Sequence, residues 1–89
     1  MYKIEIEKPA KEKLDKLGVT NWGIWEKENS AFDWEYDSDE ICYILDGNAT
    51  VKTEWEEVSF GTGDLVKFPK GLKCVWTITK PIRKHYNFS

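Results

Sequence analysis

Few side chains in this chain could do chemistry. The sequence holds one histidine, His85, which is expected to face outward, and two cysteines, Cys42 and Cys74. A zinc site of Cys and His ligands needs more of these residues than the chain has, so any metal would have to be bound mainly by carboxylates. The candidate catalytic residues are Glu40, Cys74 and Lys84, because a lysine beside a cysteine favours the reactive thiolate. The alternative to a catalytic role is that Cys74 is simply a small side chain of the hydrophobic core.

The segment from Phe32 to Asp37 indicates which side chains face inward. Aromatic and acidic residues alternate there, and successive side chains of a strand point to opposite faces. A slip of one residue would bury the acids and expose the rings, and an unpaired buried carboxylate is costly. Trp34 and Tyr36 are therefore predicted to point inward, and Asp33 and Glu35 to face solvent.

The same alternation predicts two charged groups in the interior. Glu40 shares a strand face with Cys42 and Ile44. Lys84 lies on the more apolar face of the last strand, together with Ile82, Tyr86 and Phe88. Each charge would be expensive to bury alone, and pairing offsets part of that cost. We therefore expect an ion pair between Glu40 and Lys84.

The elements that carry these residues are predicted to be short strands and one helix. Pro9 suits the start of a helix over Ala10–Leu17, and Gly18 suits its end. Asp46-Gly47 is a strong signal for a tight turn, so the strands on its two sides are predicted to pair as a hairpin. The predicted strands are Tyr2–Glu7, Trp22–Glu26, Phe32–Tyr36, Ile41–Leu45, Ala49–Thr53, Val58–Phe60, Leu65–Phe68, Lys73–Thr79 and Pro81–Phe88. Many short strands with Gly and Pro between them indicate a β-barrel or sandwich.

Two stretches of the chain resemble the two signatures of cupins. Glu40 is followed by six residues and then Gly47, which matches the second half of the first signature. Gly63 is followed by five residues, Pro69-Lys70-Gly71, two residues and Cys74, which follows the second signature. The strings at 32–36, 43–47, 71–76 and 83–86 resemble the small cupins of the (S)-ureidoglycine aminohydrolase and ethanolamine-utilisation branch. The resemblance implies one all-β cupin (RmlC-like) domain over residues 1–89, a double-stranded β-helix or jelly-roll barrel with a short N-terminal helix.

The resemblance also implies where a cupin metal would be bound. Typical cupins hold a divalent metal with three histidines and one glutamate. Here only Glu40 is retained, and the other positions map to Trp34, Tyr36 and Cys74. We therefore expect no metal and no cofactor. The alternative is an unusual metal site formed by Asp33, Glu35, Glu40 and Cys74. Such a site would combine hard carboxylate oxygens with one soft thiolate, and a given metal usually prefers one of these two ligand types.

These placements predict a ligand pocket with a polar floor of Glu40 and Lys84. Apolar cavities with a few convergent polar groups are typical ligand sites. The predicted ligand-binding residues are Trp34, Tyr36, Glu40, Cys74, Trp76, Lys84 and Tyr86. The first hypothesis is therefore a small-molecule-binding cupin for a compact polar or sugar-like compound. The alternative is that the ion pair replaces a lost metal and serves stability alone.

Two other functions stay open. The ureidoglycine resemblance implies a hydrolase of ureido or amino compounds, although those enzymes look like two-domain, metal-dependent cupins. The third hypothesis is an interaction module, with Trp22, Trp25 or Trp55 on a homodimer face, since a small barrel gains stability by pairing.

Composition narrows the partners and the location. The 89-residue chain has a formal net charge of −3 with both signs mixed along it, which argues against a nucleic-acid partner. It has no run of about 18 apolar residues, so we expect no membrane partner. The N-terminal segment lacks the apolar core of a signal peptide, so we expect a cytoplasmic protein.

Overall fold

Two long strands organise the fold. The computed structural model describes residues 3–88, in which β4 (Glu40–Lys52) and β7 (Lys73–Phe88) pair antiparallel along most of their length. From Cys74 to Ile78 every second side chain of β7 is buried, as the alternation of apolar and polar residues predicts. This alternation directs one face of each long strand into the core.

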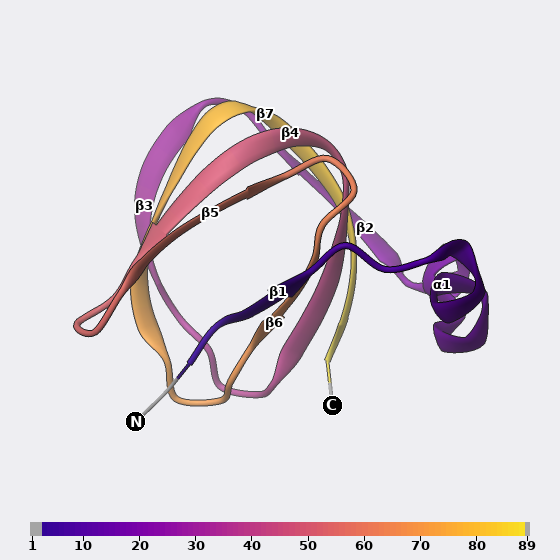
Figure 1. Ribbon diagram of the computed structural model, residues 1–89. Coiled ribbons are helices and arrows are strands. Elements are labelled where there is room, and N and C mark those ends of the chain that lie inside the picture. Colours follow the sequence, from indigo (N-terminus) through magenta and orange to yellow (C-terminus); the bar gives the residue numbers. More distant parts are fainter. Residues whose placement is uncertain (1–2, 89) are drawn as a thin grey trace.

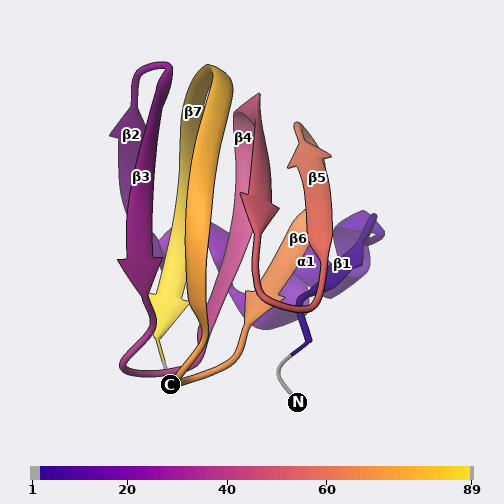
Figure 2. The ribbon, with the colours of Figure 1, turned by 90° about the vertical axis from the view of Figure 1, so that its left-hand side faces the viewer.

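Shorter strands extend this pair into a seven-stranded antiparallel sheet that curls into a barrel (Figure 1). The two halves of β7 pair with β3 (Ser30–Glu35) and β2 (Gly23–Lys27). The two halves of β4 pair with β6 (Leu65–Phe68) and β5 (Glu57–Gly61), and β6 also pairs with β1 (Glu5–Glu7). Figure 2 shows β3, β7, β4 and β5 side by side on one face of the barrel.

Both long strands change neighbours at a bend, and Gly47 lies at the bend of β4. The register between β4 and β7 shifts between Ile44 and Ala49. Gly47 has φ 98°, and a Cβ there would lie 2.3 Å from the carbonyl oxygen of Pro81 in β7. Glycine therefore permits both the backbone conformation and the close approach of the two strands at this corner.

The predicted hairpin at Asp46-Gly47 is wrong. Ile41–Leu45 and Ala49–Thr53 do not pair with each other, because the chain bends at Gly47 and continues as β4. The two strands predicted on either side of Lys80 are likewise one bent strand, β7. A strand that passes from one half of a barrel to the other at a bulge shows the same Gly and Pro signals as a turn.

The predicted helix is confirmed as α1 (Lys11–Leu17), which lies outside the barrel (Figure 1). Ala10 is its N-cap residue, and Gly18 ends it with φ 69°. The 3-10 helix η1 (Val19–Asn21) follows at once and was not predicted. Tyr2 of the first predicted strand lies outside the described residues. No helix within residues 3–88 is long and apolar enough to span a membrane.

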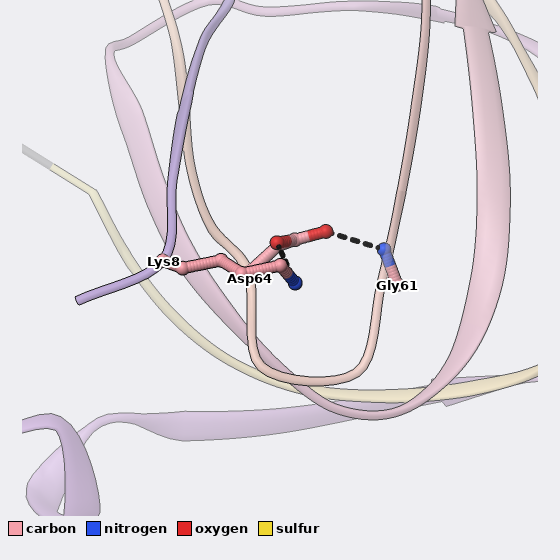
Figure 3. Close-up of polar contacts among 3 residues, drawn as sticks. All are labelled: Lys8, Gly61 and Asp64. Carbon is pink, nitrogen blue, oxygen red and sulfur yellow. Dashed lines mark hydrogen bonds and ion pairs between the residues drawn. The ribbon is translucent and has the colours of Figure 1, made fainter. Parts of the chain in front are cut away.

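A buried carboxylate links the segment before α1 to the turn between β5 and β6. Asp64 is 8% exposed and accepts hydrogen bonds from Lys8 Nζ at 2.8 Å and from the backbone N–H of Gly61 at 2.8 Å. Figure 3 shows the carboxylate between these two donors. The contact fixes the turn and anchors the N-terminal segment, so we assign it a structural role.

The core is aromatic at its centre. The indole of Trp76 packs against the rings of Phe60 and Phe68, with centroids 5.4 and 5.6 Å away. The ring of Tyr36 stacks on Phe68 at 4.8 Å. Large rings allow a barrel of this size to bury much apolar surface with few residues, and they form the base on which the site is built.

Candidate functional site

A cavity of about 190 Å³ lies between β2, β3 and the ends of β4 and β7. Its lining is almost entirely aromatic, with one carboxylate and one ammonium group. The lining residues are Trp25, Phe32, Trp34, Tyr36, Glu40, Trp76, Lys84, Tyr86 and Phe88. We call it the aromatic cavity.

The expected ion pair between Glu40 and Lys84 is confirmed. Lys84 Nζ donates to Glu40 Oε2 at 2.7 Å, and both side chains are buried, with 7% and 5% of their surfaces exposed. The ammonium also lies 5.0 Å from the ring centroid of Trp25 and 4.9 Å from that of Trp76. Carboxylate and indole faces together therefore hold the cation in a fixed position.

Tyr36 supplies a neutral hydroxyl to the same cavity. Trp76 Nε1 donates a hydrogen bond to Tyr36 Oη at 3.1 Å. Burial raises the pKa of Tyr36 well above its ordinary value, and the nearby Glu40 carboxylate raises it further. The phenol therefore keeps its proton at any physiological pH and can donate it.

Cys74 does not have the role expected of it. The side chain is buried but is not among those that line the aromatic cavity, and its thiol donates to the carbonyl oxygen of Trp34 at 3.7 Å. Burial and the Glu40 carboxylate raise the pKa of Cys74 to about 11. The thiol form thus dominates at neutral pH, which disfavours the nucleophile hypothesis.

The pKa of Cys42 shows why the Lys84 ammonium does not convert a nearby thiol into a reactive thiolate. Burial raises the pKa of Cys42 to about 12 although the Lys84 ammonium lowers it. Loss of solvation therefore outweighs the favourable charge. Both cysteines are free thiols inside the barrel wall, and the structure supports the alternative reading of Cys74 as a core residue.

The predicted register of residues 33 to 36 is confirmed. Tyr36 is buried, while Asp33 and Glu35 are exposed. Trp34 lines the aromatic cavity but is 49% exposed, so it forms part of the rim rather than the interior that alternation alone predicted. The half-exposed ring of Phe88 also belongs to the lining.

The residues at the cupin metal positions do not fit a metal ion. Glu40 is the one retained donor, and it is bound to Lys84, a fixed positive charge. The alternative set with Asp33 and Glu35 is wrong, because those two side chains are exposed while Glu40 is buried. Within residues 3–88 no three His, Cys, Asp or Glu side chains gather closely enough to ligate a metal. No chemical step is therefore assigned to a metal.

Three lining residues were missed by the sequence analysis. Phe32 and Phe88 share strand faces with predicted lining residues, so alternation could have identified them. Trp25 was placed on an exposed dimer face but lies beside Lys84 across the β2–β7 pairing, which no local pattern reveals. The expectation that His85 faces outward is wrong: it is only 9% exposed, and its buried Nδ1 has no hydrogen-bond partner among residues 3–88.

Comparison with known proteins gives one family and several similar folds. Residues 14–86 match the family described as the EutQ-like cupin domain. Over 67 residues the chain is 34% identical to acetate kinase EutQ of Clostridioides difficile, and the match covers 75% of this chain but 41% of that protein. The chain therefore spans about two fifths of the length of this relative.

Two solved structures illustrate the likeness. A DUF861 family protein from Thermotoga maritima is 53% identical with a TM-score of 0.96, over 98% of this chain and 100% of that one. The EutQ protein of Clostridium difficile is 24% identical with a TM-score of 0.69, over 98% of this chain and 68% of that one. The second likeness concerns the fold alone.

Proposed function

The chain belongs to the EutQ-like cupin family, and from this membership we propose that it binds a small molecule in the aromatic cavity. The ligand lies against the indole and phenyl rings, and polar atoms at Glu40 and Tyr36 orient it, while Lys84 holds the Glu40 carboxylate in place. A concave, mainly apolar site with a few fixed polar groups is the usual form of a small-molecule site.

One observation carries this proposal: a buried ion pair forms part of the wall of a cavity. Replacing such a pair with apolar residues of similar volume is often neutral or stabilising, so stability alone is a weak reason for Glu40 and Lys84. Both residues also line the aromatic cavity, where a ligand can use them. Recognition of a polar compound accounts for charges at this place.

Two reactions, one implied by the resemblance of the sequence and one named for a relative, are not part of the proposal. The hydrolase hypothesis drew on metal-dependent cupins, whose histidine positions map to Trp34, Tyr36 and Cys74 in this chain. The name acetate kinase belongs to the EutQ relative, and the match with this chain covers 41% of that protein. Phosphoryl transfer also needs several cationic groups around the phosphates, and Lys84 is the one cation among the residues that line the cavity. We therefore propose binding and not a reaction.

The proposal is tested by screening compact polar metabolites against the 15N-labelled protein. A ligand is expected to shift the indole N–H signals of Trp25 and Trp76, and Trp34→Ala is expected to weaken its binding. Trp55→Ala is the matched control, because Trp55 is 47% exposed, close to the 49% of Trp34, but does not line the cavity. Hits that shift signals elsewhere, or that respond equally to both variants, would contradict the proposal.

A further inference from the structure

The charge balance of the aromatic cavity restricts what can bind there. Among the lining residues within the described range 3–88, only Glu40 and Lys84 carry charge, and they are bound to each other. The site therefore presents no net charge to a ligand. A carboxylate, a phosphate or an ammonium group entering it would find its natural partner already occupied.

Lys84 has little capacity left for an anion. An ammonium group has three donors. One bonds Glu40, and the nitrogen lies within cation–π distance of the rings of Trp25 and Trp76. An anionic ligand would have to draw Lys84 away and leave the Glu40 carboxylate buried without a partner.

A cationic ligand meets the opposite obstacle. The carboxylate and the two indole faces that would attract it already surround the Lys84 ammonium. A second cation at this point would lie beside the first in a poorly solvated site, and like charges in contact are strongly unfavourable. The site is thus selective against both signs of charge.

Groups that suit an uncharged polar ligand remain. The Tyr36 hydroxyl accepts from Trp76, and its own proton is not used in that bond. A carboxylate has about four lone-pair positions, of which Lys84 occupies one, so Glu40 can still accept from a hydroxyl group. The rings of Phe32 and Trp34 offer apolar faces at the same site.

The volume sets the size of the ligand. The aromatic cavity has a volume of about 190 Å³. This is below the usual range for drug-sized ligands, which begins at about 300 Å³. A single ring with small substituents fits this space.

We infer that the ligand is an uncharged, hydroxylated ring of monosaccharide size. This inference rests on the proposed function, because it names the class of compound that the aromatic cavity takes. The hydroxyl groups bond Glu40 and Tyr36, the C–H face of the ring packs on the aromatic side chains, and the Glu40–Lys84 pair stays intact.

The first test uses sets of compounds that share a ring and differ in charge. Methyl glycosides of the common hexoses and pentoses are titrated beside the corresponding uronates and 2-amino sugars, and the indole N–H signals are followed. We expect a neutral glycoside to bind about ten-fold or more tightly than its charged counterparts. Tighter binding of a uronate or an amino sugar would overturn the inference and leave the proposed function standing.

No response to any compound of these sets up to about 10 mM, well above a millimolar Kd, would also overturn the inference. The broader metabolite screen then decides the proposed function separately. The two ideas therefore fail in distinguishable ways, because a charged or unrelated hit supports binding in the cavity without supporting a neutral sugar.

Charge variants give the second test. Lys84→Met leaves the Glu40 carboxylate and two indole faces open, so it is expected to gain about ten-fold affinity for the amino sugar. Glu40→Gln leaves Lys84 without its anion and should gain affinity for the uronate instead. The double variant Glu40→Gln/Lys84→Met restores neutrality and is the matched control, which should gain affinity for neither.

Folding of each variant is checked from its amide spectrum before titration. If one single variant does not fold, the other still tests the charge argument. Unchanged charge preference in a folded single variant would overturn the inference.

Discussion

Lys84 is the residue on which most of the site depends. Its ammonium is held by Glu40 of β4 and by the faces of Trp25 of β2 and Trp76 of β7, so three strands fix the position of one atom. Removal of one member of a buried pair leaves the other charge without compensation. The pair therefore has consequences for stability as well as for recognition.

Lys84→Met should lower the free energy of unfolding by about 3–5 kcal/mol, because the Glu40 carboxylate stays buried without a partner. The double variant Glu40→Gln/Lys84→Met should recover most of that loss, since no charge remains. Urea denaturation followed by tryptophan fluorescence measures both. A loss in the double variant equal to the sum of the losses in Lys84→Met and Glu40→Gln would mean that the two residues are not coupled.

The neighbouring residue Arg83 provides the control for this prediction. Arg83 Nε lies 3.2 Å from Glu26 Oε1, and the two side chains are 54% and 67% exposed. Exposed pairs are worth about 0–1 kcal/mol, so Arg83→Met should change the stability little.

The two cysteines predict a loss of stability at alkaline pH. Burial raises the pKa of Cys42 to about 12 and that of Cys74 to about 11, from an ordinary value of 9.0. Well below pH 9.0 both thiols are protonated in the folded and the unfolded chain, so they give the stability no pH dependence there. As the pH rises further the unfolded chain loses these protons first, and the free energy of unfolding falls.

Urea midpoints between pH 8 and pH 11, at intervals of about half a unit, measure this effect. Tyr36 acts in the same direction at higher pH, since its pKa is also raised by burial. Replacement of both cysteines by alanine should therefore reduce the slope without abolishing it. A midpoint that rises with pH, or an unchanged slope in the variant, would contradict the assignment of raised thiol pKa values.

At the scale of elements, the bends in β4 and β7 set the shape of the barrel. Each long strand pairs with one neighbour before its bend and with another after it. Glu40 lies before the bend of β4, whereas Lys84 lies after the bend of β7. Antiparallel pairing places the first half of β4 against the second half of β7, and the close approach at Gly47 and Pro81 forms the corner at which both strands bend.

Gly47→Ala should lower the free energy of unfolding by at least about 3 kcal/mol, because strain at positive φ adds to a backbone clash. The added Cβ would lie 2.3 Å from the Pro81 carbonyl oxygen. Gly63→Ala is the matched control: its φ of 91° is similar, but nothing lies within 4 Å of the added atom. Its expected cost is about 1–2 kcal/mol from backbone strain alone.

Thermal and urea denaturation of the two glycine variants measure this difference. Similar losses of unfolding free energy in both variants would show that the close approach of β4 and β7 does not contribute to stability. The same comparison separates two contributions to the loss of unfolding free energy: the strain of a side chain at positive φ, and the clash between β4 and β7 at the corner.

At the scale of the whole molecule, the chain has the cupin barrel, whereas the side chains at the positions of the usual cupin metal ligands differ. Of the four positions that the resemblance to cupins assigns to a metal, only Glu40 carries a metal-binding side chain of the usual kind. An ammonium supplied by the chain itself lies against that carboxylate. The one carboxylate retained from the cupin ligand set is therefore paired with a positive charge of the chain itself.

We expect the purified protein to contain less than stoichiometric metal by elemental analysis, and chelation to leave its unfolding midpoint unchanged. The reason is that Glu40 is bound to Lys84 and the other positions carry Trp34, Tyr36 and Cys74. The metal content of the Lys84→Met variant is the informative comparison, because this substitution leaves the Glu40 carboxylate without its cation. One metal per chain in the unmodified protein, with a lower midpoint after chelation, would contradict this expectation.

Much of the site could be predicted because alternation is a local property. Charged and aromatic residues at alternate positions predicted that Tyr36, Trp76 and Lys84 face inward, and they do. The expectation of a Glu40–Lys84 pair followed from the cost of burying each charge alone. Trp25 and the continuity of β4 could not be predicted in this way, because strand pairing depends on residues far apart in the sequence.

The sequence by itself therefore determined the cupin-type fold, the inward face of each main strand and the absence of the usual histidine ligands at the cupin positions. Tertiary structure alone decided which strands lie side by side, and hence that two indoles enclose the Lys84 ammonium and that Cys74 lies outside the cavity lining. The physical reason is that a strand's periodicity specifies the direction of its side chains, whereas their neighbours depend on long-range pairing and on where the strands bend.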